Sequence, residues 1–346
     1  MRTFRSIGLV MLFLAVGATP VLACAGLIGP NGAVNLLRTT TLAAHHNGVE
    51  HYVTSFTFQG GGGGKFGSIV PLPGIPTKVE RGGDWTLQRL IRETQRELEE
   101  ATALRAAQSR AANDNARVIL ETRIDALDIT ILEGGGTAVG RWARDNGFIL
   151  PPDAPEMLDF YASRSPIFMA ARFDADAARK RGQQIGDGTP IHLTIPVQNP
   201  WVPLRILALG KKASEVVRAD VYLLTDIRPV FLPGPRRGLT LRSSDLASPD
   251  LMRDLRSDKG MGWMPANGMW LTHLTINSAA GDLTYDLAVD VSGWGRPSPE
   301  AAGLVPVRRP TIPGLPGSVP AELPFLIGGV LLAGAWAARP DRRRPV

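Results

Sequence analysis

The stretch AVNLLRTTTLAAHHNGVEHYVTSFTFQ, residues 33–59, decides the fold class. Apolar and β-branched runs flank Asn47-Gly48, a pair that supplies the positive φ angles of a type I′ turn. The pattern therefore predicts a β-hairpin. In this hairpin His46 faces Val49, and His45 forms the next cross-strand pair with Glu50.

Amphipathic helical patterns lie in the middle of the chain. One helix begins at Asp84, a good N-cap residue, and has apolar residues recurring on one face. A short helix over 137–145 ends at Asn146-Gly147, a left-handed stop. A third helix starts at Asp153, where Glu156 completes a capping-box arrangement.

Strand patterns dominate the remaining sequence. Two short runs occupy 117–121 and 127–132, and further runs extend from Ile167 to Val291 without a fixed repeat. Strands on both sides of a helical middle predict an α+β fold with a largely antiparallel sheet. The aromatic residues Trp142, Phe148, Tyr161 and Trp201 are expected to anchor the core.

Five consecutive glycines precede Lys65 and resemble a phosphate-binding loop. A P-loop needs a Ser or Thr after Gly-Lys and a glycine five residues before that pair, but Phe66 and Gln59 occupy these positions. The following sequence is a strand pattern, so no helix N-terminus is available to hold a phosphate. The glycines are therefore interpreted as a loop tip between strands, and no nucleotide or other cofactor is predicted.

Both ends of the chain carry targeting patterns. Arginines at positions 2 and 5, an apolar run over 7–18 and small residues up to Ala23 are typical of a secretory signal peptide. Near the other end, Leu323 to Ala338 is an uncharged run of about 16 residues, slightly short for a bilayer span. Four arginines follow it, and the positive-inside rule would keep them in the cytoplasm.

These patterns divide the chain into six segments. The predicted segments are a signal peptide (1–23), an α+β domain (24–235), a β-rich extension (236–302), a Pro-rich linker (303–322), a transmembrane helix (323–339) and a basic cytoplasmic tail (340–346). The main domain is accordingly expected on the periplasmic or extracellular side of the cytoplasmic membrane.

The net charge of +6 comes largely from the targeting segments. Without their six arginines and two carboxylates, the exported part carries a net charge of about +2. No basic stripe with interleaved aromatic residues is present, so nucleic acid is not an implied partner. The membrane, and an unknown envelope protein or ligand, are the partners that the sequence indicates.

The single cysteine, Cys24, directly follows the expected cleavage point after Ala23. It has three interpretations: the lipid-bearing cysteine of a lipoprotein box, an N-terminal nucleophile with its own amine as base, or an inert thiol. Because it is the only cysteine, no intramolecular disulfide is possible.

Three histidines gather at the hairpin turn: His45, His46 and His51. A zinc site needs ligands that converge from more than one element, and the spacing here offers no such pattern, so these residues are interpreted as a surface cluster rather than a metal site. His192 and His273 lie in alternating strand patterns and are expected to be sheet residues. No catalytic residues are assigned.

Several longer stretches resemble a known family. They are VPLPGIP (70–76), LDITILEGGGTAVGRWARDNGF (127–148), LDFYASRSPIFMAARF (158–173), and PVQNPWVPLRILALG followed by DVYLLTDIRP, ending at Pro229. In order and spacing they are similar to the bacterial domain-of-unknown-function family 2330, which comprises exported proteins. The resemblance implies export and membrane association, and it supplies no catalytic residues. Members usually carry a second cysteine close to the first, which this chain lacks.

The sequence therefore predicts an exported, membrane-anchored cell-envelope protein whose role is structural or binding rather than catalytic. The alternative is an envelope hydrolase or transferase that uses Cys24 or a metal at the His45, His46 and His51 hairpin.

Overall fold

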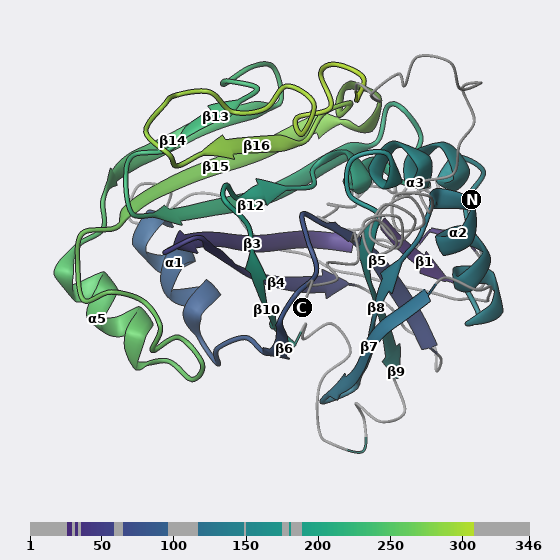
Figure 1. Ribbon diagram of the computed structural model, residues 1–346, viewed down its shortest axis with the longest axis horizontal. Helices are drawn as coiled ribbons and strands as arrows, with labels where there is room; N and C mark the ends of the chain where they lie inside the picture. The colour runs from purple at the N-terminus through teal and green to yellow at the C-terminus, as the bar shows by residue number, and fades with distance from the viewer. Residues whose placement is uncertain are drawn as a thin grey trace, which may run out of the picture. The chain divides into compact units, whose positions relative to one another are not determined.

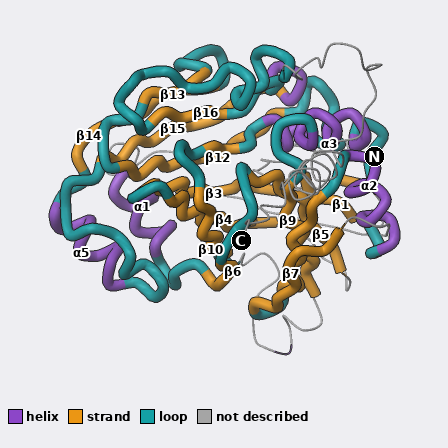
Figure 2. Tube along the Cα trace, in the orientation of Figure 1, coloured by secondary structure: helices purple, strands orange, loops and turns teal. Residues whose placement is uncertain are grey.

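The computed structural model describes residues 26–29, 32–33, 36–58, 65–95, 117–148, 150–174, 180 and 189–307. The described residues up to 306 belong to one compact unit. Three sheets and a few helices build this unit, as Figures 1 and 2 show.

The largest sheet has seven strands and contains the predicted hairpin. Its strand order is β14 (Leu239–Leu246), β15 (Trp270–Ala279), β12 (Val216–Thr225), β3 (Leu36–His46), β4 (Val49–Phe58), β10 (Ile191–Pro196) and β6 (Lys78–Arg81). All neighbouring pairs are antiparallel except β12 and β3 at the centre, which are parallel.

A six-stranded sheet and a three-stranded sheet complete the β structure. The six-stranded sheet has the order β2 (Gly32–Ala33), β1 (Gly26–Gly29), β5 (Lys65–Leu72), β9 (Ile167–Asp174), β8 (Leu127–Glu133) and β7 (Arg117–Ile124). The three-stranded sheet has the order β11 (Trp201–Val202), β16 (Leu287–Asp290) and β13 (Val230–Leu232). Their pairs are all antiparallel.

The helices form two groups. The described helices are α1 (Thr86–Gln95), α2 (Gly136–Asp145), α3 (Ala154–Ala162) and α5 (Pro249–Ser257), with the 3₁₀ turns η1 (Arg205–Ala208) and η2 (Ala280–Asp282). Figure 1 shows α1 and α5 together beside the seven-stranded sheet, and α2 and α3 beside the six-stranded sheet.

The central strands of the seven-stranded sheet separate two hydrophobic cores. In β3, Leu42 and Ala44 belong to a smaller core with the apolar residues of α1 and α5, whereas Ala43 belongs to the larger core. In β12, Tyr222 and Leu224 alternate in the same way with Leu223. Side chains on successive residues of a strand point to opposite faces, so strands buried on both faces must be apolar throughout. This explains the nearly continuous apolar runs in this part of the sequence.

The larger core joins the other elements. It contains buried residues from β5, β8 and β9 of the six-stranded sheet together with those of α2 and α3. The four predicted core anchors Trp142, Phe148, Tyr161 and Trp201 are all buried in it, which confirms that prediction.

The α+β class and the largely antiparallel sheets are confirmed. Asn47 and Gly48 both have positive φ, His46 pairs with Val49, and His45 pairs with Glu50, as the hairpin pattern predicted. The residues expected as a β-rich extension supply β14 and β15 to the same sheet as the hairpin. Helix α5 within them was not predicted, although Ser248 caps it through a hydrogen bond from Leu251 N–H to its Oγ.

The helix start predicted at Asp153 is confirmed, since Asp153 is the N-cap residue of α3, but the capping box expected there and the cap expected at Asp84 are wrong. Helix α1 begins at Thr86, and the carboxylate of Asp258 receives the backbone N–H groups of Asp84, Trp85 and Thr86. The side chain of Asp153 makes no cap hydrogen bond at α3, because it instead accepts the N–H of Gly210. At α1 the distant carboxylate of Asp258 replaces the local cap, and at α3 the distant N–H of Gly210 occupies the local carboxylate.

Among the described residues, no helix combines the length and the apolarity that crossing a bilayer requires. The predicted signal peptide, the cleavage site Ala23 with Cys24, the glycine run 60–64 and the predicted transmembrane helix 323–339 lie outside the described residues.

Candidate functional site: a cleft on the six-stranded sheet

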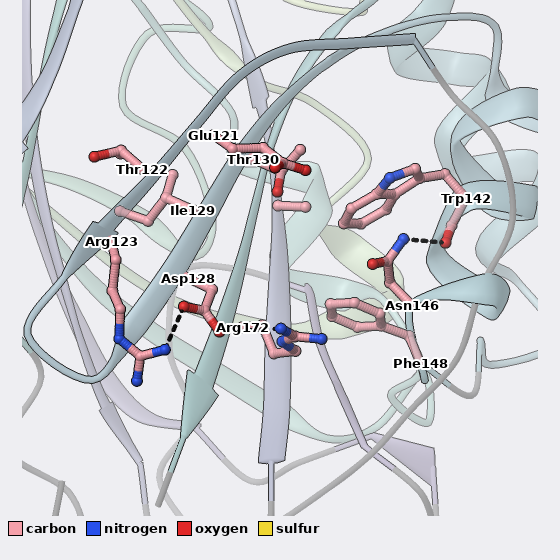
Figure 3. A pocket seen from close by; sticks show the side chains of 11 residues that line it. Glu121, Thr122, Arg123, Asp128, Ile129, Thr130, Trp142, Asn146, Phe148 and Arg172 are labelled. Atoms are coloured by element: carbon pink, nitrogen blue, oxygen red, sulfur yellow. Dashed lines mark hydrogen bonds and ion pairs between the residues drawn. The ribbon is translucent and has the colours of Figure 1, made fainter. Parts of the chain in front are cut away.

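A cleft of about 420 Å³ opens on the six-stranded sheet. This volume falls within the range of small-molecule sites. Its lining comes from β7, β8, β9, α2 and the segment after α2: Glu121, Thr122, Arg123, Asp128, Ile129, Thr130, Trp142, Asn146, Phe148, Ala170 and Arg172. Figure 3 shows Trp142 and Phe148 on one side of the cleft, Arg123 and Asp128 on the other, and Arg172 between them.

The aromatic side of the cleft is built where α2 ends. Gly147 has a φ of +89°, so the chain turns sharply after the helix and brings Phe148 back beside Trp142, with ring centroids 5.9 Å apart. Asn146 Nδ2 donates to the carbonyl of Trp142, at 3.3 Å. The ring of Phe148 occupies the space that a Cβ on Gly67 of β5 would need, so a glycine is required there. The aromatic wall is thus fixed from both sides.

The charged side of the cleft is a ladder across three strands. Asp128 is the cross-strand partner of Arg123 in β7 and of Arg172 in β9. Its Oδ1 accepts from Arg123 Nη1 at 2.8 Å, and its Oδ2 accepts from Arg172 Nη2 at 3.0 Å. Half-exposed ion pairs of this kind add little to stability. What the ladder does is hold two guanidinium groups in fixed positions.

The chemistry of the lining suits recognition. Arg172 is 39% exposed and engages Asp128 through one terminal nitrogen, so the rest of its fork can donate to an anion in the cleft. Trp142 and Phe148 line the cleft beside it but are largely buried, at 7% and 2% exposed, so they offer only a small apolar edge. The described lining residues include no His, Cys or Ser, but they do include the carboxylates of Glu121 and Asp128.

Two carboxylates near the ends of β8 are held in ion pairs outside the ladder. Glu133 pairs with Arg117 across β7 and β8, at 2.8 Å, and Asp125 lies 3.1 Å from the Arg81 side chain. The importance of Asp128 was missed, because its second partner, Arg172, comes from a strand 44 residues further along the chain.

The predicted histidine cluster is dispersed by the fold. Adjacent residues of a strand point to opposite faces, so His45 and His46 diverge. His45 Nε2 lies 2.9 Å from the carbonyl of Val197, and His46 Nδ1 lies 2.6 Å from Asp226 Oδ1. No group of three metal-binding side chains suited to an ion occurs in the described part of the chain.

His51 belongs to a different cluster. Its Nδ1 lies 2.9 Å from Nε2 of His192 in the neighbouring strand β10, and its ring stacks on Trp263 at 3.5 Å between centroids. His192 Nδ1 faces Glu80 Oε1 at 3.5 Å. Burial, with the nearby imidazoles adding to it, lowers the pKa of His51 to about 3. Burial lowers the pKa of His192 to about 4, against the attraction of Glu80.

His273, the other histidine expected in a sheet, lies in β15 and is buried. Its Nε2 lies 3.1 Å from Asp220 Oδ1, and its ring stacks on Tyr222. His192 and His273 are thus both buried strand residues, as the alternating patterns predicted.

Two fully buried carboxylates were not singled out by sequence reasoning. Burial raises the pKa of Glu50 well above its ordinary value, although Trp201 N–H donates to it. Burial raises the pKa of Asp286 to about 7, against the hydrogen bonds from Arg205 N–H, Tyr161 Oη–H and Leu204 N–H. The hydrogen bonds of Asp286 link α3 and η1 to the start of β16. Neither Glu50 nor Asp286 lines the cleft.

Similarities to solved structures are weak. Baculovirus P35 is 8% identical with a TM-score of 0.34, over 71% of this chain and 92% of that chain. The chain from the caspase-8/P35 complex is 9% identical with a TM-score of 0.34, over 70% of this chain and 91% of that chain. A mutated baculovirus P35 after caspase cleavage is 7% identical with a TM-score of 0.35, over 70% of this chain and 94% of that chain. At these TM-scores the similarities carry no argument. No curated protein matches the chain.

One family model covers the hairpin, the cleft and the strands between them. It is described as "Uncharacterized protein conserved in bacteria (DUF2330)", and it matches residues 21–229, more than half of the sequence. The chain belongs to this bacterial family.

Proposed function

We propose that this protein is an exported, membrane-anchored protein of the bacterial cell envelope that binds a ligand in the cleft of the six-stranded sheet. Export and anchoring are supported by the signal-peptide pattern of 1–23 and by the apolar run with terminal arginines near the other end. The binding role is supported by the cleft.

The observation that carries the binding role is the Arg123–Asp128–Arg172 ladder beside Trp142 and Phe148. A guanidinium held in place by a carboxylate does not have to be ordered again when a ligand arrives, so less conformational entropy is lost on binding. The planar fork suits a carboxylate, and the small exposed edge of the largely buried Trp142 and Phe148 suits an apolar group next to it. The ligand class is therefore a small molecule or chain end that carries a carboxylate beside an apolar or aromatic group.

The enzyme alternative has less support. Its metal version needs His45, His46 and His51 to converge, but each has a different partner. Its nucleophile version depends on Cys24, which lies outside the described residues.

The binding role is tested with short peptides that end in a free aromatic residue, compared with the same peptides amidated at that end. The free carboxylate forms should raise the melting temperature of the protein in proportion to the logarithm of ligand concentration, and the amidated forms should do so much less. Arg172→Gln should weaken binding by about 10- to 100-fold, since a hydrogen bond to a charged group contributes about 1.5–3 kcal/mol.

Arg218→Gln is the matched control, because Arg218 is an exposed arginine of the seven-stranded sheet, next to Asn277. This variant should bind like the unchanged protein. Equal affinity of the two variants, or no response to either peptide form, would remove the cleft as the binding site for this class of ligand.

A further inference from the structure

An exposed tryptophan stands on the loop DVSGWGR, residues 290–296, which follows β16 of the three-stranded sheet. Trp294 is 80% exposed, the largest exposed fraction among the big apolar side chains of the described residues. A fully hydrated indole has no role in folding, because burying it is what would stabilise the protein. Its exposure points to a partner.

The loop is held rigidly from below. Asp290 is buried, and its Oδ1 accepts from Ser292 N–H at 2.9 Å and from Ser292 Oγ–H at 2.5 Å, while its Oδ2 accepts from Arg296 N–H at 2.9 Å. Trp294 N–H donates to Ser292 Oγ at 3.3 Å. Gly293 and Gly295 have φ values of +85° and +66°, which other residues rarely adopt. The indole is therefore presented outward by a preorganised turn.

Aliphatic side chains surround the base of the turn. A Cβ at Gly293 would lie 3.7 Å from Ile227 Cδ1, and one at Gly295 would lie 4.0 Å from Val230 Cγ2. Ile227 is 38% exposed and Val230 is 45% exposed. We call these residues, together with Trp294, the Trp294 patch. Ile227 follows the end of β12 and Val230 begins β13, and both lie beside the glycines that flank Trp294.

Positive charge borders the Trp294 patch. Arg228 follows Ile227 directly, with its guanidinium 5.6 Å from the ring centroid of Trp270, and Arg296 lies two residues after Trp294; both arginines are exposed. The carboxylate beside them, Asp226, is paired with His46 at 2.6 Å, and that of Asp290 is turned inward. The two loops therefore present two exposed arginines and one exposed carboxylate, that of Asp226, which is 42% exposed and bonded to His46.

An apolar tip with an arginine border fits a lipid surface better than a sugar or a nucleic acid. Tryptophan side chains prefer the headgroup level of a bilayer, and each arginine near an anionic membrane contributes about 1 kcal/mol of attraction. A glycan platform would need polar side chains beside the ring, whereas Ile227 and Val230 lie beside the two glycines that flank Trp294. The proposed membrane segment begins about 15 residues after the described domain, a reach of roughly 45 Å for an extended Pro-rich linker.

We propose that the Trp294 patch rests on the anionic surface of the membrane that anchors the protein, with the indole at headgroup level and Arg228 and Arg296 among the phosphates. This inference rests on the proposed membrane anchoring. The patch would fix which side of the domain faces the lipid and which side faces the envelope.

The test uses the full exported chain in vesicles of phosphatidylethanolamine and phosphatidylglycerol (3:1). In a Cys24→Ser background, Trp294→Cys carries an environment-sensitive fluorophore. The control probe is placed by Val216→Cys, which is 39% exposed and lies at the opposite end of the ten-residue strand β12, roughly 30 Å away. Flotation of the vesicles first shows whether the chain is anchored.

With the chain anchored, the probe at 294 should shift to shorter wavelength and be quenched at least twofold more by headgroup-level spin-labelled lipid than the probe at 216. The difference should shrink in vesicles of phosphatidylcholine alone, and likewise on adding Arg228→Gln and Arg296→Gln. Equal, water-like signals from both probes on floating vesicles would overturn the inference while leaving the anchor in place. A 294 signal that depends on protein concentration rather than on lipid would also overturn it, in favour of a protein partner. Failure of the chain to float would instead remove the proposed anchor.

Discussion

The hydrogen bond between the imidazoles of His51 and His192 limits how many protons these two buried rings can carry. One ring must donate and the other must accept, so the pair cannot hold together with both rings protonated. The pKa of His51 is lowered to about 3 and that of His192 to about 4, both chiefly by burial. In the unfolded chain both rings take up protons near pH 6.5.

The stability contributed by this pair should therefore be complete above about pH 6.5 and should fall as the pH drops toward 4, because the unfolded state binds more protons in that window. His192→Gln should flatten the dependence of the unfolding free energy on pH by up to about 1.4 kcal/mol per pH unit between pH 4 and 6.5. Urea unfolding at several pH values measures this slope.

Asp286 provides a control of opposite sign. Its pKa is raised to about 7 by burial, so its contribution is complete below about pH 4 and is lost as the pH rises toward 7. Asp286→Asn should make the fall of the unfolding free energy toward acid pH steeper, whereas His192→Gln should make it shallower. If both variants changed the slope in the same direction, the assignment of the two groups would be wrong.

At the scale of elements, α1 depends on a carboxylate that comes from the end of α5. Asp258 accepts three backbone N–H groups at the start of α1 as well as the hydroxyl of Thr86, at 2.7 Å. Burial opposes ionisation of this carboxyl, but the hydrogen bonds outweigh burial and hold its pKa below the ordinary value. Asp258→Ala should lower the unfolding free energy by about 2–3 kcal/mol in urea titrations at pH 7, because the buried donors lose their partner.

Asp254 is the matched comparison, since it also links α5 to α1 through Arg89 at 2.9 Å but is partly exposed. Asp254→Ala should cost no more than about 1 kcal/mol. Similar losses from the two substitutions would show that Asp258 acts as an ordinary surface charge rather than as the cap of α1.

At the scale of elements, the sequence predicted the features that depend on neighbouring residues in the chain. Asn47-Gly48 and Asn146-Gly147 specify their turns through φ angles of their own, so the hairpin and the end of α2 were correctly predicted. The cap of α1 was not, because Asp258 is more than 170 residues away in sequence. The Arg123–Asp128–Arg172 ladder was not predicted. The expected strand ended at residue 121, before Arg123, and the pairing of Asp128 with Arg172 requires knowing that β9 lies beside β8.

At the scale of the whole molecule, both proposed targeting segments can be read in one measurement. The intact mass of the protein from the membrane fraction of its host should correspond to a chain that begins at Cys24 and retains the terminal arginines 342–344. Retention of residues 1–23 would contradict the signal peptide. A lipid on Cys24, or loss of the C-terminal segment, would replace the single-span anchor with lipidation or processing.

The parallel pairing of β3 with β12 has a consequence for the order of folding. It joins residues 39–45 to residues 219–225, so the centre of the largest sheet cannot close until most of the chain is available. Contacts between residues so far apart in sequence make folding slow, because loop closure precedes the energy gained from pairing. If the chain is exported amino-terminus first, as proposed, it delivers β3 and β4 as an unfinished hairpin. The same delay that exposes this hairpin to aggregation would keep the chain unfolded enough to be threaded through a translocation pore.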